Sequence, residues 1–238
     1  MTDNTASERK PIRRLVAAAH NAPPKSTKDQ IDLQAKERHS TPHFCNAENY
    51  TYVVRNIIKY ADEKITIATR HPEFFFGENA KYTSLIADFL TNKKGTLNVL
   101  TDEESMAKMT GLVIPSVSSA IPTFKKELAT SVAESDAFKL LQSPKYNMRV
   151  QVGIAEKLPI MFEKSNPIIF ITNNHNMVAS EVNNNSMKGY CFNDRAYTRS
   201  LNSSFQEKMR ENTTTMVDFR QTYKGSFFES LWSKFNMF

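Results

Sequence analysis

KITIATR at residues 64–70 and TLNVLT at residues 96–101 are two short apolar runs that enclose an amphipathic segment at residues 82–90. Each run has the length and composition of a buried strand. The segment between them places Leu85, Ile86 and Phe89 on one helical face. Gly95 stands where a glycine commonly ends such a helix. The order strand, helix, strand is the alternation expected of an α/β fold.

The flanking sequence continues this alternation. Upstream, apolar residues at spacings of three and four predict a helix over residues 50–61. Asp194 is expected to cap a helix whose inward stripe runs from Tyr197 to Met209. Between them we expect a helix over 124–141, strands over 148–154 and 168–172, and a hairpin of 177–182 with 187–192. The predicted fold is α/β, a sheet of about five to seven strands flanked by helices.

The two ends of the chain differ from this pattern. Residues 1–42 are rich in Pro, Ser, Thr and Lys, so we expect a basic, mostly disordered tail before a single domain over residues 43–238. The tail could still form short helices against a partner. The C-terminal stretch carries an aromatic helical stripe of Phe228, Leu231, Trp232 and Phe235. It suits a helix packed on the core or an exposed helix that binds a partner or drives assembly; a membrane-surface helix would need a more basic polar face.

Composition narrows the environment and the partners. The sequence has no apolar run long enough for a membrane span or a secretory signal, so we expect a cytoplasmic protein. Cys45 and Cys191 lie far apart and outside any CxxC spacing, which favours two buried thiols. The net charge of +6 is compatible with a nucleic-acid partner, but it does not single one out.

Three stretches resemble the phospholipase D-like domain over roughly residues 48–210: the opening unit at 64–101, NMRVQVGIAE at 147–156, and residues 168–205. The resemblance implies that family's fold and a site built on histidine and lysine in a His-x-Lys pair followed by aspartate. Here the matching stretch is His175-Asn176-Met177, so Met177 stands where the lysine would neutralise phosphate charge. The resemblance therefore implies a degenerate active site.

Polar residues follow several predicted strands, where open α/β sheets bind ligands. Arg70 and His71 follow the first strand, Asp102 and Glu103 the second, Glu156 the third, and the stretch Asn173 to His175 the fourth. They could form one cleft with His175, His71, Arg70 and Asp102 as candidate catalytic residues, although loops at strand ends are commonly polar without any such role. Phe74, Phe75 and Phe76 could stack a base, but burial of one or two of them is the simpler expectation.

No histidine or cysteine spacing indicates a metal site, and no glycine-rich phosphate loop occurs, so we expect neither metal nor cofactor. The leading hypothesis is a non-catalytic regulatory or interaction module on a degenerate phospholipase D-like scaffold. Its expected partner is a protein or a second copy of the chain, with nucleic acid next. Two alternatives stay open: a phosphodiesterase or nuclease with an atypical site around His175, and a structural protein that assembles through the C-terminal helix.

Overall fold

The computed structural model describes residues 27–76, 81–116, 121–134, 149–155, 158, 170–181, 188–211 and 213–218. The helices in these ranges are α3 (Lys28–Lys36), α4 (Ala47–Lys59), α5 (Glu73–Phe76), α6 (Thr83–Thr91), α7 (Glu103–Thr110), α8 (Ile121–Glu134) and α10 (Arg195–Glu211). The strands are β1 (His43–Cys45), β2 (Lys64–Ala68), β3 (Thr96–Asp102), β4 (Val150–Ala155), β5 (Phe170–Asn173), β6 (Val178–Glu181), β7 (Lys188–Cys191) and β8 (Thr213–Asp218).

The strands form one mixed sheet in the order β1-β7-β6-β5-β2-β3-β4-β8. The three strands β2, β3 and β4 are parallel, with Ile65 opposite Leu97 and Val99 opposite Val152. All other pairings are antiparallel, including that of β5 with β2. The direction of β5 matters for function because residues that follow β5 emerge at the opposite edge from residues that follow β2 and β3.

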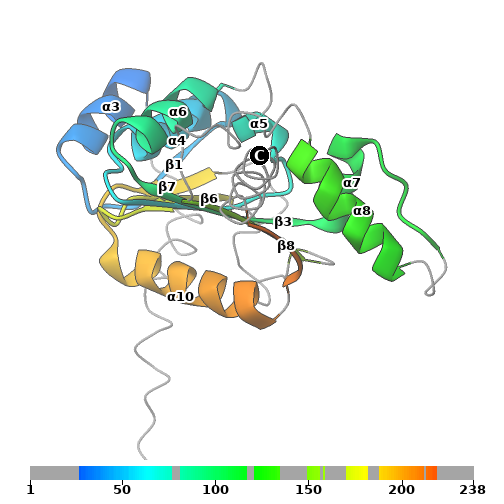
Figure 1. Ribbon diagram of the computed structural model, residues 1–238. Coiled ribbons are helices and arrows are strands. Elements are labelled where there is room, and N and C mark those ends of the chain that lie inside the picture. Colours follow the sequence, from blue (N-terminus) through cyan, green and yellow to red (C-terminus); the bar gives the residue numbers. More distant parts are fainter. Residues whose placement is uncertain are drawn as a thin grey trace, which may run out of the picture.

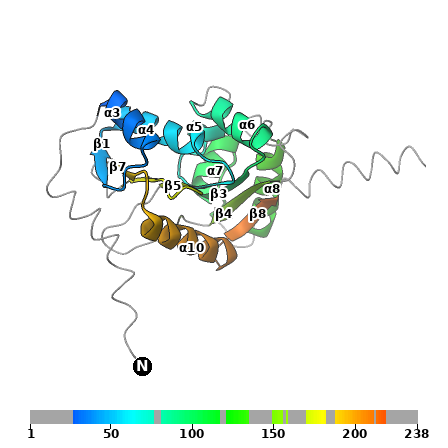
Figure 2. The same cartoon turned by 90° about the vertical axis from the view of Figure 1, so that its left-hand side faces the viewer.

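Helices cover both faces of the sheet, so the confirmed class is α/β. Helices α3, α4 and α6 lie on one face and α10 lies on the other, as two perpendicular views show (Figures 1 and 2). The alternation of side chains along the strands divides the core accordingly. Ile65 and Ile67 belong to the cluster under α4, whereas Ala68 packs with Leu201 and Phe205 of α10.

The six strands predicted from the sequence are all present, and two more extend the sheet to eight. Strand β1 has three residues, too few to show a period, and β8 has the polar sequence TTTMVD. Helix α7 was also missed, because its only buried apolar residues are Met106 and Ala107. Its ends carry clear signals: Asp102 caps the first turn, and Gly111 ends the helix in the left-handed conformation at φ 74°.

The expected tail needs one correction, because part of it belongs to the fold. Helix α3 packs on α4 with Ile31 and Ala35 fully buried. A capping box between Thr27 and Gln30 begins this helix, and the Gln34 side chain accepts a hydrogen bond from the Tyr190 hydroxyl at 2.9 Å. The sequence indicated a short helix over residues 31–38 that would form against a partner, and the structure shows that its partner is its own domain. Residues 1–26 lie outside the described residues.

Gly95 has a different role from the one predicted. Lys94, not Gly95, takes the left-handed conformation after α6, at φ 55°. A β-carbon on Gly95 would lie 1.9 Å from Cζ of Phe89. Gly95 is therefore required by the close approach of a buried ring rather than by its own backbone angles.

Cys45 and Cys191 are both buried and do not form a disulfide with each other, as the sequence indicated. Burial raises the pKa of the Cys191 thiol to about 11. Within the described ranges, no helix combines the length and the apolar character that crossing a membrane would require.

Candidate functional site

Arg70 and Asp102 come together at the C-terminal ends of the parallel strands, which we call the carboxyl edge of the sheet. Because Ala68 pairs with Leu100, the residues that follow β2 meet the end of β3. Arg70 Nε lies 3.5 Å from Oδ2 of Asp102, whose side chain is 7% exposed. The other carboxylate oxygen, Oδ1, accepts a hydrogen bond from the backbone N–H of Ser105 at 2.8 Å. Asp102 therefore both caps α7 and balances the charge of Arg70.

A cleft of about 830 Å³ opens beside this pair, between the strand ends and helices α7 and α8, with both charged and apolar residues in its lining. His71 lines the cleft, and its backbone N–H donates to the Thr69 hydroxyl at 2.9 Å. Lys125 Nζ lies 4.0 Å from Oε1 of Glu103 at the same cleft. The cleft thus carries charges of both signs rather than a cluster of one sign.

An apolar cavity of about 250 Å³ adjoins the cleft, and His71 lines both. Its walls include the rings of Tyr50, Phe74, Phe75 and Tyr82, and the Phe75 and Tyr82 centroids are 5.3 Å apart. Burial raises the pKa of both tyrosine hydroxyls. The aromatic lining suits a small planar group, with His71 between the cavity and the cleft that Arg70 lines.

Two of the three consecutive phenylalanines are buried, as the simpler expectation predicted. Phe75 is 7% exposed and Phe76 is 2% exposed, so both belong to the core. Phe74 is 52% exposed, and its ring lies 5.5 Å from that of His71. Only Phe74 could stack on a ligand from solvent.

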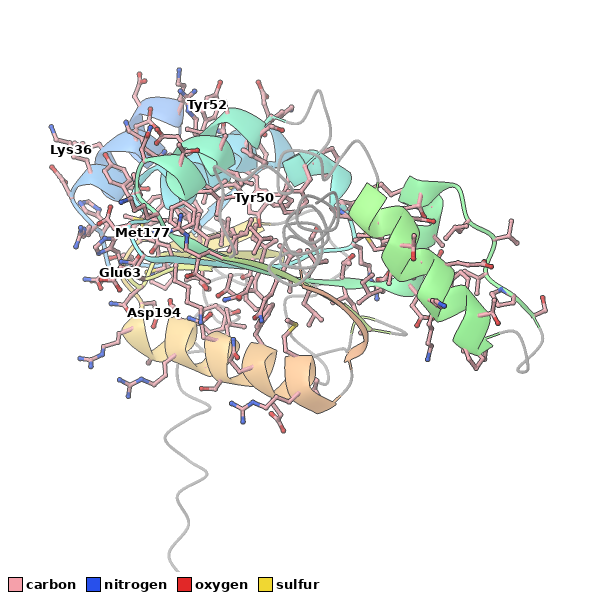
Figure 3. The ribbon with its side chains drawn as sticks, in the orientation of Figure 1. Lys36, Tyr50, Tyr52, Glu63, Met177 and Asp194 are labelled. Atoms are coloured by element: carbon pink, nitrogen blue, oxygen red, sulfur yellow. The ribbon has the colours of Figure 1, made fainter. Side chains whose placement is uncertain are left out.

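His175 lies at the other edge of the sheet, which corrects the prediction of a single cleft. Strand β5 runs antiparallel to β2, with Asn173 opposite Ile65, so the turn after β5 lies beside the start of β2. Figure 3 shows Glu63 and Met177 at the end of the sheet away from α7 and α8. The five residues of β2 separate the two edges by about 17 Å at ~3.3 Å per residue. The sequence did not reveal the direction of β5.

The His175 ring is hydrogen-bonded to the carboxylate of Asp62. The Nε2 atom of His175 lies 2.6 Å from Oδ2 of Asp62, and this hydrogen bond is the main reason that the pKa of Asp62 lies below its usual value. Lys93 Nζ is 3.8 Å from the other oxygen of Asp62, but it donates to the carbonyls of Lys59, the last residue of α4, and Ala61. Met177 is fully buried.

Asn173 and Asn174 hold the turn that carries His175. Asn173 accepts hydrogen bonds from the N–H groups of His175 and Met177 and donates to the carbonyl of Ile57 at 2.8 Å. Asn174 accepts from the N–H groups of Asp62 and Glu63. The sequence placed both asparagines at a strand end. It did not reveal that the Asn173 side chain makes three hydrogen bonds to backbone groups and so has a structural role.

A third cleft, not anticipated from the sequence, lies between this turn and α10. It is lined by asparagines 173, 174 and 176 and by the polar face of α10 from Arg195 to Arg210. The sequence held one signal of this cleft: Arg195 and Arg199 lie one helical turn apart, and so on the same face of the helix.

Other candidates lie outside the described residues: Glu156 and the C-terminal stripe Phe228, Leu231, Trp232 and Phe235. Among the residues that the structure describes, no three His, Cys, Asp or Glu side chains come together to hold a metal ion.

Comparison with known proteins gives distant structural similarity alone. No family model matches the chain, and no curated protein sequence matches it. The chain is similar to the archaeal chromatin protein TrmBL2, described as binding DNA, at 10% identity and a TM-score of 0.45, over 87% of this chain and 63% of that one. It is similar to the phosphatidylserine synthase of Haemophilus influenzae Rd KW20 at 10% identity and a TM-score of 0.43, over 76% of this chain and 40% of that one. The chain thus spans less than two thirds of either protein.

Proposed function

We propose that this protein is a non-catalytic regulatory or interaction module that binds a small ligand at the carboxyl edge of β2 and β3. The observation that carries the proposal is the division of the candidate residues. His175 stands at one edge of the sheet, and Arg70, His71 and Asp102 stand at the other. The phospholipase D-like resemblance fits this view as a scaffold without that family's histidine and lysine pair.

The surroundings of His175 do not suit phosphoryl transfer. A histidine that attacks phosphorus needs a cation to offset the charge that develops on the phosphoryl oxygens. His175 is paired with the carboxylate of Asp62, and the nearby Lys93 is engaged with two backbone carbonyls. Arg70 cannot substitute because it follows the opposite end of β2. These features favour a structural role for His175 over the alternative of an atypical phosphodiesterase.

The carboxyl edge, in contrast, has the properties of a binding site. Small-molecule sites are concave and mostly apolar, with a few polar groups that fix orientation. The aromatic cavity supplies the apolar part, and Arg70 and His71 of the adjoining cleft supply the polar part. We propose a ligand with a planar apolar body and an anionic group. Its binding would be communicated through α4 and α5, which line the aromatic cavity, and through α7 and α8, which line the cleft.

The test has two arms. Phosphodiesterase activity on bis(4-nitrophenyl) phosphate and on DNA should be undetectable for the wild type. Activity that is lost in His175→Ala would overturn the non-catalytic assignment. In the second arm, a panel of planar aromatic carboxylates is screened by thermal shift. Arg70→Gln and Phe74→Ala should abolish any shift, and Arg55→Gln on α4 serves as the matched control. A shift that survives both variants would remove the ligand from this site.

A nucleic-acid interface is the second candidate, and one observation favours it. A groove of about 450 Å³ between α3 and α4 combines Lys28, Lys36, Arg55 and Lys59 with two tyrosines, against a single acid, Asp32. Lys28 Nζ lies 5.1 Å from the centroid of the Tyr52 ring, and Figure 3 shows Lys36 and Tyr52 on these helices. A basic groove with aromatic rings can follow a phosphate backbone and stack a base. Binding of a labelled DNA oligomer should weaken steeply with salt and fall in Lys28→Glu with Lys59→Glu.

Protein partners and self-association remain predictions. They depend on the C-terminal aromatic stripe, which lies outside the described residues. Light scattering over a range of protein concentrations tests the assembly alternative directly.

A further inference from the structure

The cleft between the β5–β6 turn and α10 is independent of the carboxyl-edge site and differs from it in chemistry. Its volume is about 630 Å³, within the usual range for small-molecule sites. The argument rests on six of its lining residues, Asn174, Arg195, Thr198, Arg199, Asn202 and Arg210. In Figure 3 the label of Asp194, the residue before α10, lies at the same end of the sheet as that of Glu63.

The amides that line the cleft present donors. The Oδ1 atom of Asn174 accepts from the backbone N–H groups of Asp62 and Glu63 at 3.0 and 3.2 Å. Backbone N–H groups can only donate, so this geometry fixes which end of the Asn174 amide is the oxygen. The Oδ1 atom of Asn202 accepts from the Thr172 hydroxyl at 2.9 Å. In both residues the oxygen is occupied within the protein, and the NH₂ group remains to donate.

A buried hydroxyl adds an independent sign of a missing ligand. The Thr198 side chain lines the cleft, the residue is 3% exposed, and its Oγ1 atom has no hydrogen-bond partner within the described part of the chain. Buried polar groups are nearly always hydrogen-bonded, so an unpaired hydroxyl buried in the wall of a cleft calls for explanation. A rotation of the Thr198 side chain that brings the hydroxyl to an acceptor atom bound in the cleft would supply the missing bond.

The charge of the cleft is positive. Three arginines line it against one acid, Glu207. Arg195 and Arg199 lie one turn apart on α10, and neither forms an ion pair within the described residues. The amino-terminal end of α10 adds the positive end of the helix dipole beside them. The carboxylate of Asp194 is nearby, but its Oδ1 accepts from the N–H of Tyr197 as the helix cap.

We propose that this cleft binds the phosphate group of a small phosphorylated compound with a polar body. Guanidinium forks, amide NH₂ groups and a hydroxyl form a set of donors that matches phosphate oxygens. The phosphate lies between Asn174, Thr198 and the two arginines at the start of α10. The remainder of the compound extends along the helix towards Arg210, where every lining residue carries a polar group, which favours a sugar or nucleoside over a lipid chain.

Isothermal titration calorimetry at low salt, with inorganic phosphate, AMP and adenosine, tests the proposal. Phosphate and AMP should bind saturably, and adenosine should not. Arg195→Gln with Arg199→Gln should weaken AMP binding roughly tenfold or more. Lys126→Gln removes an exposed cation from α8, away from the cleft and from the groove between α3 and α4, and should leave binding unchanged. Circular dichroism confirms that each variant is folded.

Thr198→Val supplies a readout that a merely structural role would not give. Loss of the hydroxyl should weaken AMP binding severalfold, and it should leave the unliganded protein as stable as the wild type or more so, because an unpaired buried hydroxyl is removed.

Three results would overturn the proposal. The first is absence of saturable phosphate and AMP binding, and the second is equal binding of adenosine and AMP. The third is tighter binding of a DNA oligomer that displaces AMP and weakens in the same arginine variants, because the cleft would then serve a nucleic-acid backbone.

Discussion

The two edges of the sheet carry similar residue types and use them differently. At the carboxyl edge, Arg70, His71 and Asp102 face a cleft and an aromatic cavity. At the opposite edge, His175 and Asp62 bind each other, and the asparagines beside them hold the turn to α4 and β2. The difference teaches that a histidine at a strand end can be engaged by a neighbouring carboxylate, as His175 is by Asp62, or can line a cleft, as His71 does. Changes to Asn173 should therefore cost stability, and changes to Arg70 or His71 at the carboxyl edge should alter binding first.

The largest effect is expected for Asn173→Ala. The Asn173 side chain is 3% exposed and makes three hydrogen bonds to backbone groups. Its loss leaves buried backbone groups unpaired, so the free energy of unfolding should fall by about 3 kcal/mol. Urea denaturation measures this change. Asn174→Ala at the exposed side of the same turn is the matched control, and equal losses for both variants would contradict the structural role of Asn173.

A smaller effect is expected at the carboxyl edge, where Asp102 has two roles that can be separated. Asp102→Ala removes both the α7 cap and the partner of Arg70, and it should cost about 1–2 kcal/mol of stability. Asp102→Asn retains a good cap and should cost less than about 1 kcal/mol, because the Arg70 side chain is 37% exposed. If the two variants prove equally destabilised in urea, the charge pair rather than the cap dominates, and the edge is less tolerant than proposed.

The smallest effect concerns pH. The hydrogen bond from His175, together with Lys93 and Arg38, holds the pKa of Asp62 below its unfolded value of 3.8. A lowered folded-state pKa stabilises the fold above the unfolded pKa, and this contribution is lost as the pH falls through the folded pKa. Because Asp62 is 60% exposed, we expect only a few tenths of a kcal/mol. The stability difference between the wild type and Asp62→Asn should shrink between about pH 5 and pH 2; a constant difference would exclude the charge as its source.

Local sequence patterns predicted the helices and strands well, but they did not predict in which direction distant strands pair. The stripes on α4 and α10 and the cap at Asp194 were readable, because amphipathic spacing and capping act within a few residues. The hairpin of β6 with β7 was readable because its strands are neighbours in sequence. The antiparallel pairing of β5 with β2 joins distant segments, and nothing local to either strand specifies it. That single direction separated His175 from Arg70 and divided the predicted site.

Pairing between distant segments also bears on how the chain is made. Strand β2 lies between β3, which follows it closely, and β5, which is synthesised much later. Translation adds roughly 5–20 residues per second. The backbone groups of β2 that pair with β5 therefore stay unpaired for roughly 5 to 20 seconds. An apolar strand with unpaired N–H and C=O groups is a template for pairing with other chains. The nascent protein is thus most exposed to aggregation, and most in need of a chaperone, before residues 170–173 leave the ribosome.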